Sequence, residues 1–114
     1  MLMQISERTE DAVPVVSITG DIDLESSPQL RTFLRSKVAQ KTPKLLLDFG
    51  GVNYIDSSGL ATLIEYFQGV QGFGGKLALA ALSPRVKNVF EIVRLEQIFS
   101  LHPDVAAGLA ALKA

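Results

Sequence analysis

Short apolar runs alternate along this chain with apolar residues at helical spacing, and this alternation limits the folds that the chain can adopt. The runs typical of strands are Gln4–Thr9, Val13–Ile18, Lys44–Phe49, Lys76–Ala81 and Ile98–Leu101. Between the later runs, apolar residues recur at i, i+3, i+4 and i+7, which is the spacing of one helix face. Strands that alternate with helices favour a mixed, largely parallel sheet with helical crossovers.

The predicted helices begin at residues that commonly start helices. Ser27 and Ser83 are predicted N-caps, because each is followed by a proline that suits the first helical position. A third helix is predicted from near Ser57 to about Phe73, where a glycine-rich turn ends it. The last helix is predicted to open after Pro103.

These elements give the order β-β-α-β-α-β-α-β-α. The first two strands are predicted to form an antiparallel hairpin through a turn at Glu10 and Asp11, and Gly20 is predicted to end the second strand. We therefore predict the α/β class, as one domain over residues 1–114. Its mixed, mostly parallel sheet of about five strands is expected to pack with four helices.

Composition excludes several classes of function. The formal net charge of −1 gives no field that would gather nucleic acid or an anionic membrane. The chain has no cysteine and one histidine, His102, so thiolate and histidine metal sites are not expected. It also lacks both a membrane-spanning run and the basic-then-apolar order of a signal peptide. We therefore expect a cytoplasmic protein with no cofactor, no metal, no nucleic-acid partner and no membrane partner.

The segment from Tyr54 to Leu60 joins a strand pattern to a helix pattern. Ser57 and Ser58 stand at this junction, where a hydroxyl can accept from the free N–H groups of the first helical turn. The same position favours negative charge, because those N–H groups and the helix dipole point at it. From the residues alone, the two serines are open to three uses: a helix cap, a nucleophile, or a site that carries a phosphate.

Two enzyme-like motifs in the chain are incomplete. The nucleophile elbow G-x-S-x-G has Ile55 in place of its first glycine. His102, predicted to lie in a loop, would have to be the base of any hydrolase that used Ser57. The glycine-rich segment before Lys76 has Val70 at the first glycine position of a phosphate-binding loop. It also runs from helix to strand, so we interpret it as a helix end.

Three aspartates of the predicted loops are candidate metal ligands. They are Asp21, Asp23 and Asp56. Carboxylates in loops are more often turn formers than ligands, so we interpret them as turn residues.

Several short segments occur together in one order along the chain. They are Gly20-Asp21-Ile22-Asp23, Leu47-Asp48-Phe49, Ile55-Asp56-Ser57-Ser58-Gly59-Leu60, Gly74-Gly75-Lys76-Leu77 and Ser83-Pro84-Arg85-Val86, followed by Phe90 and Leu95. In this arrangement the chain resembles the STAS domain family, and most closely its stand-alone anti-sigma factor antagonists. The resemblance spans about Gln4 to Leu112.

The resemblance implies a phosphorylation-switched binding protein and not an enzyme. In the family, a kinase that is also an anti-sigma factor phosphorylates the hydroxyl residue after the aspartate. That residue is Ser57 here, with Ser58 as the alternate acceptor. The unphosphorylated antagonist binds the anti-sigma factor, which uses ATP, and thereby releases a sigma factor. A serine phosphatase resets the cycle.

The resemblance also implies a partner-binding surface, with exposed residues of the helix that starts at Ser57 at its rim. The implied residues are Asp21, Asp23, Asp56, Ser57, Ser58, Gly59 and Thr62, and the rim residues are Thr62 and Gln68. Two alternatives remain. One is a STAS subunit that regulates a lipid or anion transporter, or a signalling assembly, without a phosphate cycle. The other is a small serine hydrolase that uses Ser57 with His102.

Overall fold

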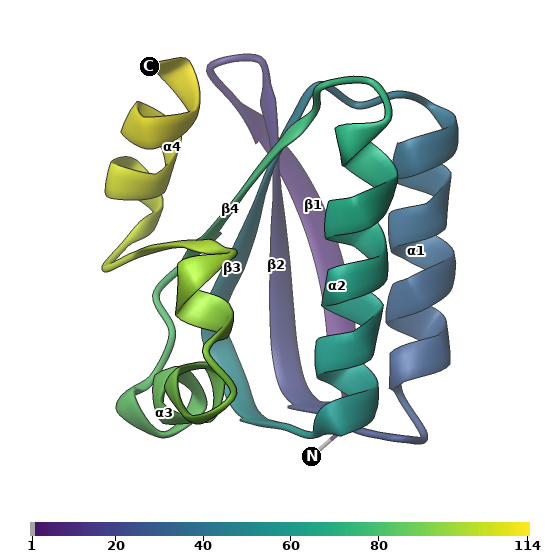
Figure 1. Ribbon diagram of the computed structural model, residues 1–114, viewed down its shortest axis with the longest axis vertical. Helices are drawn as coiled ribbons and strands as arrows, with labels where there is room; N and C mark the ends of the chain where they lie inside the picture. Colours follow the sequence, from purple (N-terminus) through teal and green to yellow (C-terminus); the bar gives the residue numbers. More distant parts are fainter. Residues whose placement is uncertain (1) are drawn as a thin grey trace.

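The computed structural model describes residues 2–114, and within this range five strands form one sheet that carries helices on both faces (Figure 1). The strands are β1 (Gln4–Glu10), β2 (Val13–Ile22), β3 (Lys44–Ile55), β4 (Lys76–Ala80) and β5 (Ser100–His102). The helices are α1 (Ser27–Ala39), α2 (Ser57–Gln71), α3 (Pro84–Ile92) and α4 (Val105–Lys113), with a 3-10 helix η1 (Leu95–Gln97) before β5. The predicted α/β class and element order are confirmed.

The strands lie in the sheet in sequence order, from β1 to β5. β1 runs antiparallel to β2, and each later pair is parallel, so the predicted mixed, mostly parallel sheet is also confirmed. The hairpin turns at Asp11 and Ala12, whose φ angles of 53° and 64° suit a type I′ turn. Because β2, β3 and β4 share one direction, the loops that follow them open at the same end of the sheet.

Helices α1, α2 and α3 cover one face of the sheet, and α4 covers part of the other (Figure 1). In β2, Val16 and Ile18 point into the larger core beneath the first three helices, whereas Val15 points into the smaller core beneath α4. Phe49 of β3 and Phe90 of α3 meet edge to face in the larger core, with ring centroids 6.3 Å apart. The central strands are buried on both faces, which explains their continuous apolar sequence.

β2 and β3 are both longer than their sequences predict. They end at Ile22 and Ile55, and their additional residues pair with each other. Asp21 lies opposite Tyr54, and Ile22 lies opposite Ile55. These polar and glycine-containing stretches are strands because each supplies the pairing partner of the other, which a local pattern does not reveal.

Gly20 does not end β2 as predicted. The strand continues through it with a φ of +91°, at a register shift between Gly20 and Asp21. Glycine adopts this conformation without steric cost, and it permits a close approach of the N-terminal segment. A Cβ atom at this position would lie 2.5 Å from the carbonyl oxygen of Leu2.

The last strand also begins later than predicted. The predicted strand was Ile98–Leu101, whereas β5 is Ser100–His102. The chain instead makes the helical turn of η1, in which the N–H of Phe99 donates to the carbonyl of Leu95 at 2.8 Å. His102 is therefore the last residue of a strand, and its predicted place in a loop is wrong.

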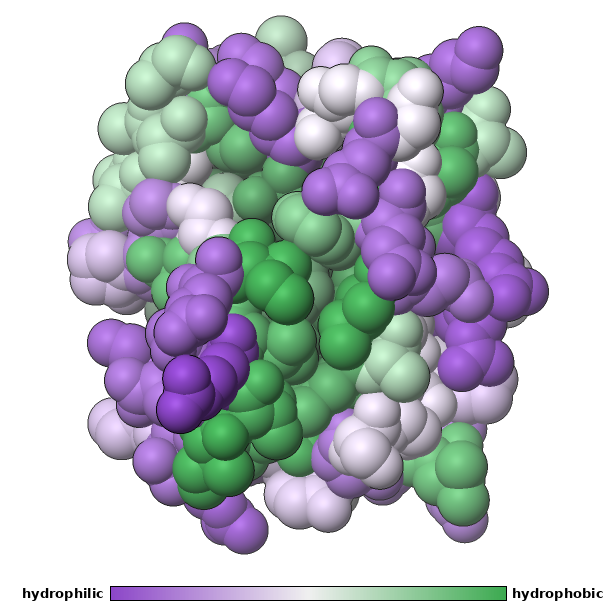
Figure 2. All heavy atoms as spheres, in the orientation of Figure 1, coloured by the Kyte–Doolittle hydropathy of each residue, from purple (hydrophilic) through white to green (hydrophobic). Residues whose placement is uncertain are grey.

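Figure 2 shows a hydrophobic surface over α3 and the adjoining side of α2. Three large apolar side chains near the end of α3 are exposed, namely Ile92, Val93 and Ile98. Within residues 2–114, no helix combines the length and the apolar character needed to cross a membrane.

Candidate functional site

Ser57 is the first residue of α2, two residues beyond the end of β3, and it is exposed. The β3–α2 connection lies beside the β2–α1 loop, because the N–H of Asp56 donates to the carbonyl of Ile22 at 3.1 Å. The two segments therefore form one surface at the end of the sheet where α2 begins (Figure 1). We call this surface, residues 21–26 and 54–59, the Ser57 edge.

Asp56, and not a serine, caps α2. Its extended backbone places carboxylate Oδ1 within 2.9 Å of the N–H nitrogen of Ser58 and 3.2 Å of that of Gly59. Burial raises the pKa of Asp56, but hydrogen bonds from Ser58 and Gly59, with a smaller contribution from the backbone of Leu24, outweigh it and hold the pKa below its ordinary 3.8. The carboxylate is thus charged at neutral pH, and the backbone N–H of Asp56, which donates to Ile22, joins the two segments of the Ser57 edge.

The two serines differ because Asp56 supplies the cap. The Ser58 hydroxyl donates to Oδ1 of Asp56 at 2.6 Å and is partly buried. Ser57 is exposed, and the cap does not use its hydroxyl. Of the two, Ser57 is therefore the serine whose hydroxyl another protein can reach.

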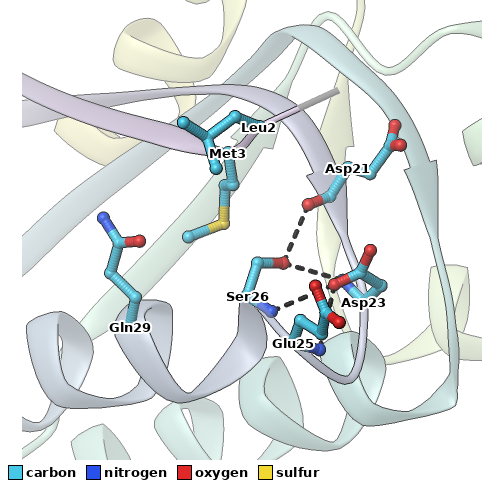
Figure 3. A pocket seen from close by; sticks show the side chains of 7 residues that line it. All are labelled: Leu2, Met3, Asp21, Asp23, Glu25, Ser26 and Gln29. Carbon is cyan, nitrogen blue, oxygen red and sulfur yellow. Dashed lines mark hydrogen bonds between the residues drawn. The ribbon is translucent and has the colours of Figure 1, made fainter.

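The β2–α1 loop is held in place by its own side chains (Figure 3). The Ser26 hydroxyl donates to the carbonyl of Asp21 at 2.8 Å and accepts from the N–H of Asp23 at 2.9 Å. The Asp23 carboxylate accepts from the N–H groups of Glu25 and Ser26, both at 3.0 Å. The predicted cap at Ser27 is wrong: α1 begins at Ser27, its N-cap residue is Ser26, and the Ser26 side chain bonds within the loop instead.

The Ser57 edge is acidic. Asp21, Asp23, Glu25 and Asp56 belong to its two segments, which contain no lysine or arginine. Beside the edge lies an open cleft of about 400 Å³ that three of these acidic residues help to line (Figure 3). No group of three or more residues among 2–114 is placed to hold a metal ion. The charge of this surface instead complements a basic protein surface.

Thr62 is not an exposed residue of the rim, as the sequence predicted. It is 1% exposed, and its hydroxyl donates to the carbonyl of Ser58 at 3.0 Å. α2 has a second stripe, formed by the buried Thr62 and Tyr66 and the half-buried Gly69. This stripe faces α1, where a Cβ at Gly69 would lie 3.1 Å from Cγ2 of Val38. The other predicted rim residue, Gln68, is exposed.

Gly59 is also buried and is therefore not a contact for a partner. A Cβ atom at this position would lie 2.7 Å from Cγ2 of Ile22 and 2.8 Å from Cγ1 of Ile55. The close approach that this glycine permits is between α2 and the ends of β2 and β3, within the protein itself.

The sequence interpretation missed two exposed apolar side chains of the Ser57 edge. Leu24 is 76% exposed and Tyr54 is 42% exposed. The available signal was an apolar residue inside an otherwise polar loop, as Leu24 is between Asp23 and Glu25.

The structure separates Ser57 from His102. Pairing across the sheet places His102 level with Ala80 of β4 and Asp48 of β3. From Asp48, β3 runs on for roughly 20 Å before it ends at Ile55, just ahead of Ser57. A base must lie within hydrogen-bond reach of its nucleophile, so these residues do not form a hydrolase pair.

Removing the Asp56 carboxylate is expected to destabilise the protein measurably. We expect Asp56→Ala to lower the free energy of unfolding by about 1–2 kcal/mol, because the N-cap of α2 and the hydrogen bond from the Ser58 hydroxyl are lost together. Denaturant unfolding measures this change. Because the folded pKa is lowered, the stabilisation should be complete above pH 3.8 and should fade as the pH falls through the folded pKa.

Asp104 provides a matched control, because its carboxylate caps α4 by accepting from the N–H of Ala107 at 2.8 Å. Asp104→Ala should lower the free energy of unfolding by about 1 kcal/mol, because it also removes a helix cap, and it should leave the Ser57 edge undisturbed. An Asp56→Ala variant as stable as the wild type would contradict the role of Asp56.

Comparison with known proteins agrees with the fold. Residues 4–108 match the STAS domain family model. The anti-sigma-B factor antagonist of Bacillus subtilis is 34% identical over 94 residues, covering 82% of this chain and 85% of that protein. The protein of the same name from Listeria monocytogenes is 28% identical over 99 residues, covering 87% of this chain and 86% of its own length.

A solved structure also matches across nearly the whole chain. The crystal structure of an anti-sigma factor antagonist from Mycobacterium paratuberculosis superposes with a TM-score of 0.91 at 26% identity, covering 99% of this chain and 96% of that one. The similar proteins are named as anti-sigma factor antagonists, and their fold is that of this chain. Because the family model also matches residues 4–108, this chain belongs to the STAS domain family.

Proposed function

We propose that this protein is an anti-sigma factor antagonist whose binding is switched by phosphorylation of Ser57. In the unphosphorylated state it binds an anti-sigma factor that is also its kinase, and the bound anti-sigma factor releases a sigma factor. A serine phosphatase restores the binding state. The protein is a binding regulator and not an enzyme, in keeping with the antagonists that it resembles. We place it in the cytoplasm, where such partners act.

One observation supports this proposal above the others: Asp56 caps α2, so Ser57 is free of any structural task and exposed. A kinase can therefore use its hydroxyl without removing a cap from the helix. Ser58 is the less suitable acceptor, because its hydroxyl is bound to Asp56. The names of the relatives favour the antagonist over a transporter subunit.

The charge of the Ser57 edge explains how a phosphate would act as a switch. A phosphoserine adds about −1.5 to −2 charges, here next to the carboxylate of Asp56 and near those of Asp23 and Glu25. Within the protein, the start of a helix tolerates negative charge. At an interface, like charges brought together cost several kcal/mol. The fold therefore survives the modification, while a partner that packs on Ser57 is rejected.

The phosphoacceptor can be tested directly with purified proteins. Incubated with its anti-sigma factor kinase and ATP, the wild-type protein is expected to gain one phosphate, measured by intact mass. Ser57→Ala should gain none, because the exposed hydroxyl is gone. Ser58→Ala is the matched control and should still be phosphorylated. Undiminished phosphorylation of Ser57→Ala would contradict the assignment.

The kinase itself can be identified by comparing two baits in a pull-down. Wild-type protein should retain an ATP-binding, kinase-like protein that the Ser57→Asp variant does not retain. The phosphorylation assay above then decides whether the retained protein is the kinase. Equal retention by both baits would argue against a switch at Ser57.

A further inference from the structure

Leu24 is the one strongly exposed apolar side chain that the β2–α1 loop carries at the Ser57 edge. It is 76% exposed, in a loop that otherwise consists of charged and hydroxyl residues. Single exposed leucines are common on protein surfaces, so exposure by itself assigns no role. The way in which the loop holds this residue is what distinguishes it.

The backbone on both sides of Leu24 is fixed by side chains. The N–H of Asp23, the residue before it, donates to the Ser26 hydroxyl, and the N–H of Glu25, the residue after it, donates to the Asp23 carboxylate. The Ser26 hydroxyl bridges the loop, and the N–H of Ser27 closes it by donating to the carbonyl of Asp23 at 2.8 Å. The loop is therefore ordered before any partner arrives, so the ordering of this backbone adds no cost to binding.

A backbone hydrogen bond ties the segment that carries Leu24 to the start of α2. The N–H of Asp56 donates to the carbonyl of Ile22, two residues before Leu24, and the Asp56 carboxylate caps the helix that Ser57 begins. A protein that covers Ser57 therefore also meets Leu24. Around them lie carboxylates, and the two segments carry no lysine or arginine.

From this arrangement we infer that Leu24 is the apolar anchor of the interface with the anti-sigma factor, and that it inserts into an apolar pocket bordered by basic groups on that partner. The inference rests on the proposed function, and it adds the chemistry of the partner surface. A few side chains that become fully desolvated inside a surrounding ring of weaker contacts supply most of the binding energy of an interface. Leu24 is exposed and held among carboxylates, which is the setting that such a residue needs. The surrounding carboxylates fix orientation and favour a basic partner.

The test is a titration of the anti-sigma factor kinase identified by the pull-down against variants of this protein. Leu24→Ala is expected to weaken binding at least tenfold, which corresponds to about 1.4 kcal/mol. Leu24→Met, which keeps an apolar side chain of similar size, should stay within threefold of the wild type. Ile92→Ala is the matched control, since Ile92 is 71% exposed on α3, and it should also stay within threefold.

A second readout separates an anchor from a general defect. With Leu24→Ala, the KM for phosphorylation of Ser57 should rise about tenfold, while kcat and the midpoint of thermal unfolding stay unchanged. Equal affinity of Leu24→Ala and wild type would overturn the inference, as would equal losses for Leu24→Ala and Ile92→Ala. If the wild-type protein is neither bound nor phosphorylated by the kinase, the proposed function itself fails, and this outcome is distinct from the other two.

Discussion

A Ser57→Asp variant is expected to bind the anti-sigma factor at least 100-fold more weakly than the wild type. The new carboxylate would stand exposed at the first position of α2, beside Asp56, on a surface that carries further carboxylates at Asp23 and Glu25. Bringing that charge against a partner costs several kcal/mol, and about 2.7 kcal/mol already corresponds to 100-fold. Isothermal titration calorimetry with the purified partner measures the loss.

Two controls separate charge from position and from size. Ser6→Asp adds the same charge to an exposed serine of β1 and should leave the affinity unchanged within about twofold. Ser57→Asn adds nearly the same volume as aspartate without its charge, so the affinity of this variant for the anti-sigma factor should fall by less than tenfold. The switch as proposed would be wrong if Ser57→Asp bound like the wild type, or if Ser57→Asn lost as much affinity.

Gly59→Val is expected to lower the free energy of unfolding by about 3 kcal/mol, at the upper end of the range for overpacked cores. Its Cβ atom alone would lie 2.7 Å from Ile22 and 2.8 Å from Ile55, and both side chains are buried and branched at Cβ. Neither can move aside easily, because each is stiff and belongs to a strand. Chemical denaturation, with the native signal followed by circular dichroism, measures this change.

Gly72→Val is the matched control for this effect. Gly72 lies at the other end of α2 in the right-handed helical region, and a Cβ there would meet only the carbonyl oxygen of Gly69, at 3.5 Å. The free energy of unfolding of Gly72→Val should differ from that of the wild type by less than about 1 kcal/mol. If Gly59→Val were as stable as Gly72→Val, the close packing of α2 against the ends of β2 and β3 would be contradicted.

The architecture could be predicted because its periodic patterns are local. Apolar runs and helical spacing gave the class, the order of elements and the mixed sheet, all of which are confirmed. The ends of β2 and β3 could not be predicted, because Asp21 and Tyr54 are in strands only through their pairing with each other. Gly20, which would usually end a strand, is tolerated here at a shift of register.

The strand–helix junction at Ser57 was predicted correctly, but the separate tasks of Asp56, Ser57 and Ser58 were not. Aspartate and serine are nearly equal as N-caps, so the sequence could not decide between Asp56 and Ser57. The extended backbone of Asp56 decides it, with a ψ of −173°. Thr62 was predicted to be exposed because helical spacing showed only the face toward the sheet, whereas α1 covers a second face. The position of Leu24 beside α2 depends on a backbone contact between Ile22 and Asp56, which are distant in the sequence.

The helix cap at Asp56 bears on how the amount of this protein in a cell would relate to its phosphorylation. Because Ser57 has no part in the cap, the proposed change of charge there would alter the population of binding-competent molecules while leaving the folded population nearly constant. Degradation, which follows the unfolded fraction, would then treat both forms alike. The response of the partner would depend on the proportion of modified copies in a pool of constant size, and not on synthesis or loss of the protein.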